Sequence, residues 1–229
     1  MNKIELAIFD MAGTTVLDKG NVNEAFRNAF NKAGIEVKPA DVDKVMGYRK
    51  IEAVQIIVDK YLPHLEEDEA TALINQIHED FTTEMVKFYE TTPELAPLPY
   101  AEECFELLQS KGVKVALNTG FTRVITNAIL QRLGWDKTPF INIVVCSDEV
   151  EEGRPHPYMI NAIMNALSVK EASSVAKTGD TEVDINEGRN ADCGLVVAVT
   201  TGAYTRDELA ACKPDYIINS LQEFPALIL

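Results

Sequence analysis

The sequence predicts an α/β protein, built on a doubly wound parallel sheet with a helical domain inserted after the first strand. Three observations lead to this prediction. Apolar, β-branched runs recur along the chain, amphipathic helical patterns separate the later runs, and one long stretch near the start holds helical patterns only. Strands that alternate with helices are typical of a parallel sheet that is covered by helices on both faces.

The expected strands are short and rich in valine, isoleucine and other apolar residues. They are Ile4–Phe9, Val113–Asn118, Ile141–Cys146, Ser174–Thr178, Gly194–Val199 and Tyr216–Ile218. Apolar residues recur at helical spacing in Ala101–Lys111, Thr122–Leu133, Pro157–Leu167 and Val183–Asn190. Pro157 falls near a helix start, where its fixed φ is tolerated. We therefore expect the sheet and its helices to occupy residues 1–15 and 92–229.

The stretch 16–91 has no good strand pattern. Apolar residues recur there at helical spacing, and the longest such pattern runs over Glu66–Tyr89. The Pro-rich segment Glu90–Pro99 that follows is typical of a linker or hinge. We expect residues 16–91 to form a helical cap, which is joined to the first strand and to the rest of the sheet by linkers and closes over the sheet.

The composition is that of an ordinary soluble globular protein, and it excludes several classes of partner. The 229 residues carry a net charge of −15 with no basic cluster to meet the phosphates of nucleic acid. No apolar run approaches the roughly 20 residues of a membrane span, and the chain does not start with a secretory pattern. The four cysteines are scattered, as is typical of reduced thiols in a cytoplasmic protein. The three histidines lack the spacing of zinc ligands.

The first candidate for the active site is Asp10, which follows the first apolar run and precedes a Gly-Thr-Thr turn. The carboxyl end of a parallel strand is where α/β enzymes place their sites. Asp10 can attack phosphorus and form an aspartyl-phosphate, or it can simply cap the turn. Many enzymes that open this way carry a second Asp two residues later as general acid or base, but this chain has Ala12. Its leaving group must therefore be activated in another way.

The second candidate is a pair of carboxylates. Asp180 follows another expected strand, and Asp184 comes one helical turn later. Carboxylates from different strand ends, together with a backbone carbonyl, form the hard-oxygen site that Mg²⁺ prefers. We expect Asp10, Asp180, Asp184 and the carbonyl of Ala12 to hold Mg²⁺. The alternative is that Asp180 caps a helix and Asp184 faces solvent.

Two further segments carry signals that are weaker on their own. Thr119 opens Thr-Gly-Phe-Thr-Arg at an expected strand-to-helix turn, where a hydroxyl and backbone N–H groups can hold phosphate oxygens. The alternative is an ordinary turn. Arg154 lies ahead of an expected helix, where a guanidinium can neutralise charge on the nucleophile and the phosphoryl group. The alternative is a surface arginine.

In order and approximate spacing, these four segments resemble the motifs of the haloacid dehalogenase-like hydrolases along the whole chain. The resemblance implies that Asp10 is the nucleophile, that Thr119 binds phosphate and that Arg154 is the basic residue. It also implies that Asp180 is a metal ligand with Asp184 as its acidic partner. The fold that it implies is a Rossmann-like core with a helical cap.

A closer resemblance is to the phosphonoacetaldehyde hydrolase (phosphonatase) subgroup. Its members also have Ala for the second Asp and Arg for the usual Lys, and they place a Schiff-base lysine in the cap within Met-Gly-x-x-Lys. Here that string ends at Lys50. An iminium between this lysine and an aldehyde withdraws electrons, so that carbon can leave phosphorus as an enamine. The alternative is a solvated helix lysine. The resemblance implies substrate contacts from Gly13, Thr14, Met46, Gly47, Gly120 and Phe121.

The chain also departs from the phosphonatase pattern. Ala53 stands where a cap histidine assists the Schiff base, and Phe121 stands where the subgroup has tyrosine. We expect a small phosphonate or phosphorylated substrate, and the resemblance implies a homodimer through the cap. Three alternatives are a phosphomonoesterase acting on a small metabolite, a mutase, and a non-catalytic protein that senses phosphate with Mg²⁺.

Overall fold

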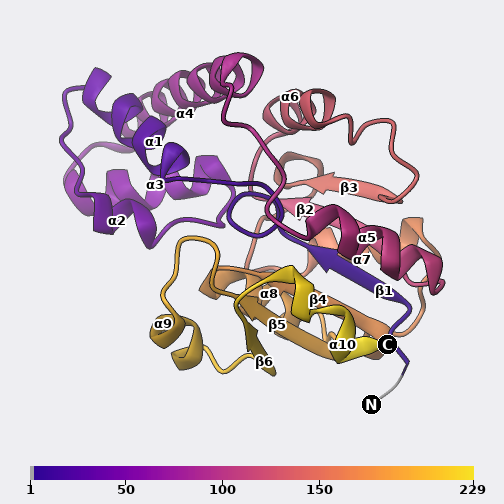
Figure 1. Ribbon diagram of the computed structural model, residues 1–229. Helices are drawn as coiled ribbons and strands as arrows, with labels where there is room; N and C mark the ends of the chain where they lie inside the picture. Colours follow the sequence, from indigo (N-terminus) through magenta and orange to yellow (C-terminus); the bar gives the residue numbers. More distant parts are fainter. Residues whose placement is uncertain (1–2) are drawn as a thin grey trace.

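The computed structural model describes residues 3–229, which contain a six-stranded sheet in the order β3-β2-β1-β4-β5-β6 (Figure 1). Every pair of neighbouring strands is parallel. The strands are β1 (Leu6–Phe9), β2 (Lys114–Thr119), β3 (Ile143–Cys146), β4 (Val175–Gly179), β5 (Leu195–Val199) and β6 (Tyr216–Ile218). The predicted doubly wound α/β fold is confirmed. Residues 1 and 2 of the predicted segment 1–15 lie outside the described residues.

The two faces of the sheet are covered by different helices, because side chains alternate along each strand. Phe9 points into a core shared with α5 (Ala101–Ser110), α6 (Arg123–Leu133) and α10 (Pro225–Ile228). Ile8 points the other way, into a core shared with α7 (Tyr158–Ala166), α8 (Glu182–Asn190) and α9 (Arg206–Ala211). Short 3₁₀ turns lie at Ser147–Glu149, Ala172–Ser174 and Leu221–Glu223.

The side of β1 on which new strands are added changes between β3 and β4. The chain first moves outward from β1 to β2 and β3, and then returns to place β4 on the other side of β1. The register pairs Phe9, the last residue of β1, with Thr178 of β4. Asp10 and Asp180 therefore follow neighbouring strands at a topological switch point, where sites form in open α/β sheets.

Four helices fill the stretch 16–91, which we call the cap: α1 (Asn21–Lys32), α2 (Pro39–Asp43), α3 (Lys50–Tyr61) and α4 (Glu67–Thr91). They lie beyond the carboxyl ends of the strands (Figure 1). Phe26 packs in the interior of these helices, where its ring centroid lies 5.4 Å from that of Phe30 and 5.3 Å from that of Phe81. The hydrophobic core continues from the sheet into these helices. The division into domains at 15/16 and 91/92 stays a prediction.

The expected linker Glu90–Pro99 begins two residues too early, because α4 continues through Thr91. Arg132 of α6 explains the extension. Its guanidinium donates hydrogen bonds to the backbone carbonyls of Tyr89 (3.3 Å), Glu90 and Thr92 (3.0 Å). These carbonyls end a helix and have no partner within it, so the arginine stabilises the last turn.

Among the described residues, none of the helices is both long enough and apolar enough to cross a membrane.

Candidate active site

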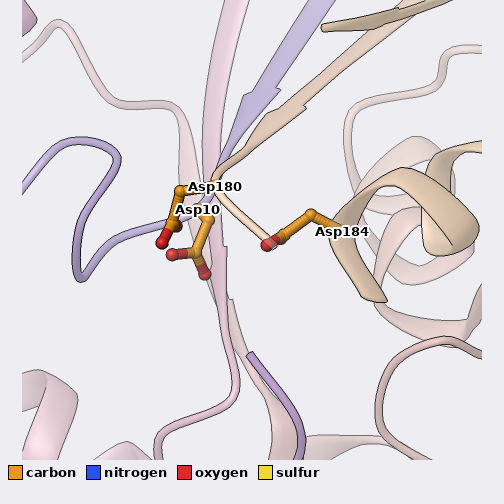
Figure 2. A group of neighbouring side chains, drawn as sticks. All are labelled: Asp10, Asp180 and Asp184. Carbon is orange, nitrogen blue, oxygen red and sulfur yellow. The ribbon is translucent and has the colours of Figure 1, made fainter. Parts of the chain in front are cut away.

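Three aspartates meet at the switch point (Figure 2). Asp10 follows β1, Asp180 follows β4, and Asp184 lies in the first turn of α8. One carboxylate oxygen from each lies within 4.8 Å of the others, and all three side chains are buried. Figure 2 shows the Asp10 and Asp180 carboxylates side by side, with Asp184 reaching toward them from its helix. The predicted gathering of carboxylates from different elements is therefore present.

The electrostatics of these aspartates fit a bound cation. Burial and the negative charges of Asp10 and Asp184 raise the pKa of Asp180 to about 8. Within the part of the chain that the structure describes, Asp180 accepts hydrogen bonds from two neutral groups, the hydroxyl of Thr14 at 2.9 Å and the backbone N–H of Ala203 at 2.7 Å. Burial likewise raises the pKa of Asp10. Arg154 and Lys177 balance the charges of Asp10 and Asp184, and a divalent metal ion would supply the positive charge that faces Asp180 among these hard oxygen donors.

Arg154 is the cation beside the nucleophile candidate. Its side chain is fully buried, which excludes the surface-arginine alternative. The Nη1 atom donates to Asp10 Oδ1 at 2.6 Å and to the carbonyl of Gly47 in the cap at 3.3 Å. Burial disfavours the charged guanidinium, but the carboxylates of Asp184, Asp10 and Glu187 outweigh that effect and raise the pKa of Arg154. The guanidinium is thus a fixed positive charge at the reacting end of Asp10.

Three buried polar residues behind Arg154 were missed by the sequence reasoning: Asn118, Lys177 and Glu187. The Glu187 carboxylate accepts hydrogen bonds from Arg154 Nε at 2.9 Å and from Asn118 Nδ2 at 2.9 and 3.0 Å. Lys177 Nζ lies 2.7 Å from Asn118 Oδ1 and 3.2 Å from Glu187 Oε2. A charge buried in this way is stable only when it is paired.

Lys177 also reaches the metal-site candidates, since its Nζ lies 3.0 Å from Asp184 Oδ1. Burial alone would raise the pKa of Asp184, but Arg154 and Lys177 lower it below its usual value. Asp184 is therefore held ionised. The available sequence signal was a lysine inside the apolar run of β4, where a charged residue has to find a buried partner.

Lys50 begins α3, and the residue is only 4% exposed. The Nζ atom donates to the carbonyl of Tyr48 at 3.3 Å and lies 5.4 Å from the centre of the Phe121 ring. Burial lowers the pKa of Lys50 from 10.5 to about 8, although the charge of Asp10 acts in the opposite direction. The solvated-lysine alternative is wrong, because Lys50 points into the interior rather than into water.

A cavity of about 160 Å³ lies between the cap and the sheet, and Lys50, Asp10 and Asp180 all line it. Among the predicted site residues, its lining includes Asp10, Ala12, Gly13, Met46, Gly47, Lys50, Thr119, Gly120, Phe121 and Asp180. Thr119 is buried there, and its Oγ1 accepts a hydrogen bond from the backbone N–H of Phe121 at 3.2 Å. A cavity of this size holds a small molecule only.

Comparison with known proteins decides the family. A model of the haloacid dehalogenase-like hydrolases matches residues 4–192. This chain belongs to that family. The hydrolase is 30% identical over 226 residues to phosphonoacetaldehyde hydrolase of Bacillus cereus, a match that covers 90% of this chain and 81% of the relative. It is therefore an enzyme of the haloacid dehalogenase type with a phosphonatase-like sequence.

A second relative is longer. The bifunctional phosphonoacetaldehyde hydrolase/aminoethylphosphonate transaminase of Clostridioides difficile is 32% identical over 210 residues, which cover 86% of this hydrolase but only 32% of the relative. The hydrolase thus spans about a third of that protein. Among solved structures, a phosphonoacetaldehyde hydrolase-like protein of Oleispira antarctica superposes with a TM-score of 0.82 at 22% identity, covering 99% of this chain and 92% of that one. This likeness supports the fold.

Three predicted site residues of this hydrolase do not line the cavity: Thr14, Arg154 and Asp184. The Thr14 hydroxyl donates to Asp180 Oδ1 at 2.9 Å. Arg154 Nη1 lies 3.2 Å from Asp184 Oδ1, so these two side chains pair with each other. Their predicted roles, like those of the other site residues, stay predictions.

Proposed function

We propose that this hydrolase cleaves the carbon–phosphorus bond of phosphonoacetaldehyde or a close analogue, with Asp10 as nucleophile and Lys50 as an imine-forming amine. One observation carries the proposal: a buried lysine with a lowered pKa shares a small cavity with a strand-end aspartate. Ala12 supports it, because no acid stands where an ester oxygen would need a proton. An iminium removes that need, since it accepts the electrons of the breaking bond.

The reaction balances as a hydrolysis. The Lys50 amine adds to the aldehyde carbon and loses water to form an iminium. Asp10 then attacks phosphorus, and the carbon–phosphorus bond electrons move into an enamine on Lys50. One water hydrolyses the aspartyl-phosphate to phosphate, and another releases acetaldehyde after the enamine takes up a proton. The net reaction consumes one water.

The remaining groups orient the phosphonate. Arg154 fixes the Asp10 carboxylate through the 2.6 Å hydrogen bond and adds positive charge where negative charge develops. Thr119 and the turn after β2 lie on the cavity wall, where they can donate to phosphonate oxygens. Asp10, Asp180, Asp184 and the carbonyl of Ala12 are the groups that would hold Mg²⁺. When bound, that ion supplies charge neutralisation for the phosphonate.

The direct test supplies phosphonoacetaldehyde with Mg²⁺ and measures both products. We expect phosphate and acetaldehyde in equal amounts. A chain that releases neither, yet hydrolyses simple phosphate esters, would contradict the proposal. Ala53 favours that second candidate, a phosphomonoesterase acting on a small metabolite, because no histidine follows Lys50 one turn along α3. Ester hydrolysis that survives Lys50→Ala would support it.

Removal of the metal should abolish turnover. After exhaustive chelation with EDTA, we expect kcat to fall at least about 100-fold and to return when Mg²⁺ is added in excess. Independently of activity, Mg²⁺ should raise the melting temperature of the wild-type protein, because a ligand that binds only the folded state stabilises it. Asp180→Asn should remove most of that thermal shift. Full activity in EDTA would contradict the metal assignment.

The pH profile should report the buried lysine. The amine attacks only when neutral, and with a pKa of about 8 the neutral fraction falls about tenfold for each pH unit below that value. The charges that act on Lys50 are those of Asp10, Arg154, Asp18 and Asp180. We expect kcat/KM for phosphonoacetaldehyde to rise from pH 6 and level off above about pH 8. A profile that is flat from pH 6 to 9 would argue against an attacking lysine.

A further inference from the structure

The segment Met46–Lys50, which we call the docking turn, brings the cap onto the core unusually closely. Its backbone meets Gly120 after β2, and a Cβ atom on Gly120 would lie 2.7 Å from the carbonyl oxygen of Gly47. It also meets Gly153, which directly precedes Arg154; a Cβ there would lie 2.5 Å from the Cβ of Arg49. Real Cβ atoms essentially never come under 3.0 Å. Only glycine at these core positions permits the observed approach.

Hydrogen bonds hold the docking turn at Gly153. The backbone N–H of Gly153 donates to Glu52 Oε1 of α3 at 3.3 Å. The Arg49 guanidinium donates to the carbonyl of Glu151 at 3.1 Å and lies 3.9 Å from Glu52. At Gly153 the cap and the core are therefore in close steric contact and are also joined by hydrogen bonds.

The docking turn determines where the Lys50 amine lies. Lys50 is its last residue, and the amine donates to the carbonyl of Tyr48 in the same turn. The carbonyl of Gly47 accepts from Arg154, the residue that binds Asp10. A displacement of the turn away from the core would thus move the Lys50 amine away from the group that Asp10 attacks.

We propose that Gly153 is a positioning residue for the imine chemistry: the missing side chain lets the docking turn come close enough to place the Lys50 amine in the Asp10 cavity. The inference rests on the proposed imine role of Lys50. In Gly153→Ala, the Cβ of Arg49 must move from 2.5 Å to the ordinary contact range of 3.4–4 Å. A displacement of about 1 Å can lower a rate about 100-fold when two groups must meet in one geometry.

The test measures two events separately in the full chain with Mg²⁺. The first is reductive trapping of phosphonoacetaldehyde on Lys50 by borohydride, which reports the amine. The second is binding of beryllofluoride, a phosphoryl analogue that takes up a position on an aspartate, which reports Asp10. For Gly153→Ala we expect trapping to slow about 100-fold while the affinity for beryllofluoride stays within about twofold. Equal loss of both would indicate a displaced Arg154 and would overturn the proposal.

A matched pair of double variants isolates the steric cause. Gly153→Ala combined with Arg49→Gly removes the Cβ that collides, and glycine is tolerated at the N-cap position that Arg49 occupies. Gly153→Ala combined with Arg49→Ala keeps that Cβ and loses the same guanidinium. We expect the Arg49→Gly double variant to recover at least about tenfold in trapping rate over the Arg49→Ala double variant. Equal rates would overturn the proposal.

The outcome also separates this inference from the proposed function. If the wild-type chain forms no adduct at Lys50, the imine chemistry itself is wrong, and the positioning role falls with it. If the wild-type chain forms the adduct and Gly153→Ala forms it at the same rate, only the positioning role is wrong. Retained binding of beryllofluoride by Gly153→Ala shows that this single variant folds.

Discussion

Asp10→Asn should abolish phosphonoacetaldehyde hydrolysis. The amide has nearly the shape of the carboxylate and can still accept the hydrogen bond from Arg154, but it is not a nucleophile toward phosphorus. We expect kcat to fall at least about 1,000-fold, as for other enzymes that lose a covalent nucleophile. Phosphate release at saturating Mg²⁺ and substrate measures it.

The same substitution has an electrostatic consequence that can be checked separately. The charge of Asp10 is a major cause, after burial, of the raised pKa of Asp180. Without that charge, the pKa of Asp180 should move back toward its usual range.

The control for the loss of turnover is Asp59→Asn, an exposed change on the outside of α3 that should leave turnover unchanged. If Asp10→Asn kept a tenth of the wild-type rate, Asp10 would not be the nucleophile.

Lys50→Met should separate activity from stability. Methionine fills a similar volume, so the cavity wall is kept, but the amine is lost and no imine can form. We expect kcat/KM for phosphonoacetaldehyde to fall at least about 1,000-fold. Lys50→Arg keeps a cation beside Phe121 and should be equally inactive, because a guanidinium stays protonated and does not condense with the aldehyde.

Although Lys50→Met should lose activity, it should be more stable than the wild-type protein at pH 7. Folding lowers the pKa of Lys50 from 10.5 to about 8, so the unfolded chain binds more protons between these two values. The free energy of unfolding therefore carries the full cost of the buried charge below about pH 8, and that cost disappears as the pH rises toward 10.5. At pH 7, Lys50→Met should melt at a higher temperature than the wild-type protein. A lower melting temperature would indicate that the ammonium is better paired than its burial implies.

The strands and the parallel sheet could be predicted from the sequence, because strand and helix patterns are local and alternate along the chain. Each expected strand lies within two residues of an observed one at either end. The end of α4 could not be predicted, because Arg132, which binds its last carbonyls, lies some 40 residues further along the chain. A sequence pattern carries no information on which distant side chain will complete a helix end.

The residues of the candidate site likewise include some that could be predicted from the sequence and some that could not. Asp10, Asp180 and Asp184 could be predicted because each follows or opens a regular element at the carboxyl edge of the sheet. Asn118, Lys177 and Glu187 come from three separate elements and become partners only when the sheet is assembled. Thr14 lies within the Gly-Thr-Thr turn that follows Asp10, and its hydroxyl binds Asp180. The direction of a side chain depends on the packing around it, which motif spacing does not contain.

The most direct test of the imine mechanism is borohydride trapping with phosphonoacetaldehyde, followed by mass mapping of the peptides. Hydride delivered to the imine carbon would convert the transient bond to Lys50 into a stable secondary amine. We predict one reduced adduct on Lys50, formed only in the presence of both reagents and missing in Lys50→Met. No adduct on Lys50, in a protein that still releases phosphate from the same substrate, would contradict the proposed mechanism.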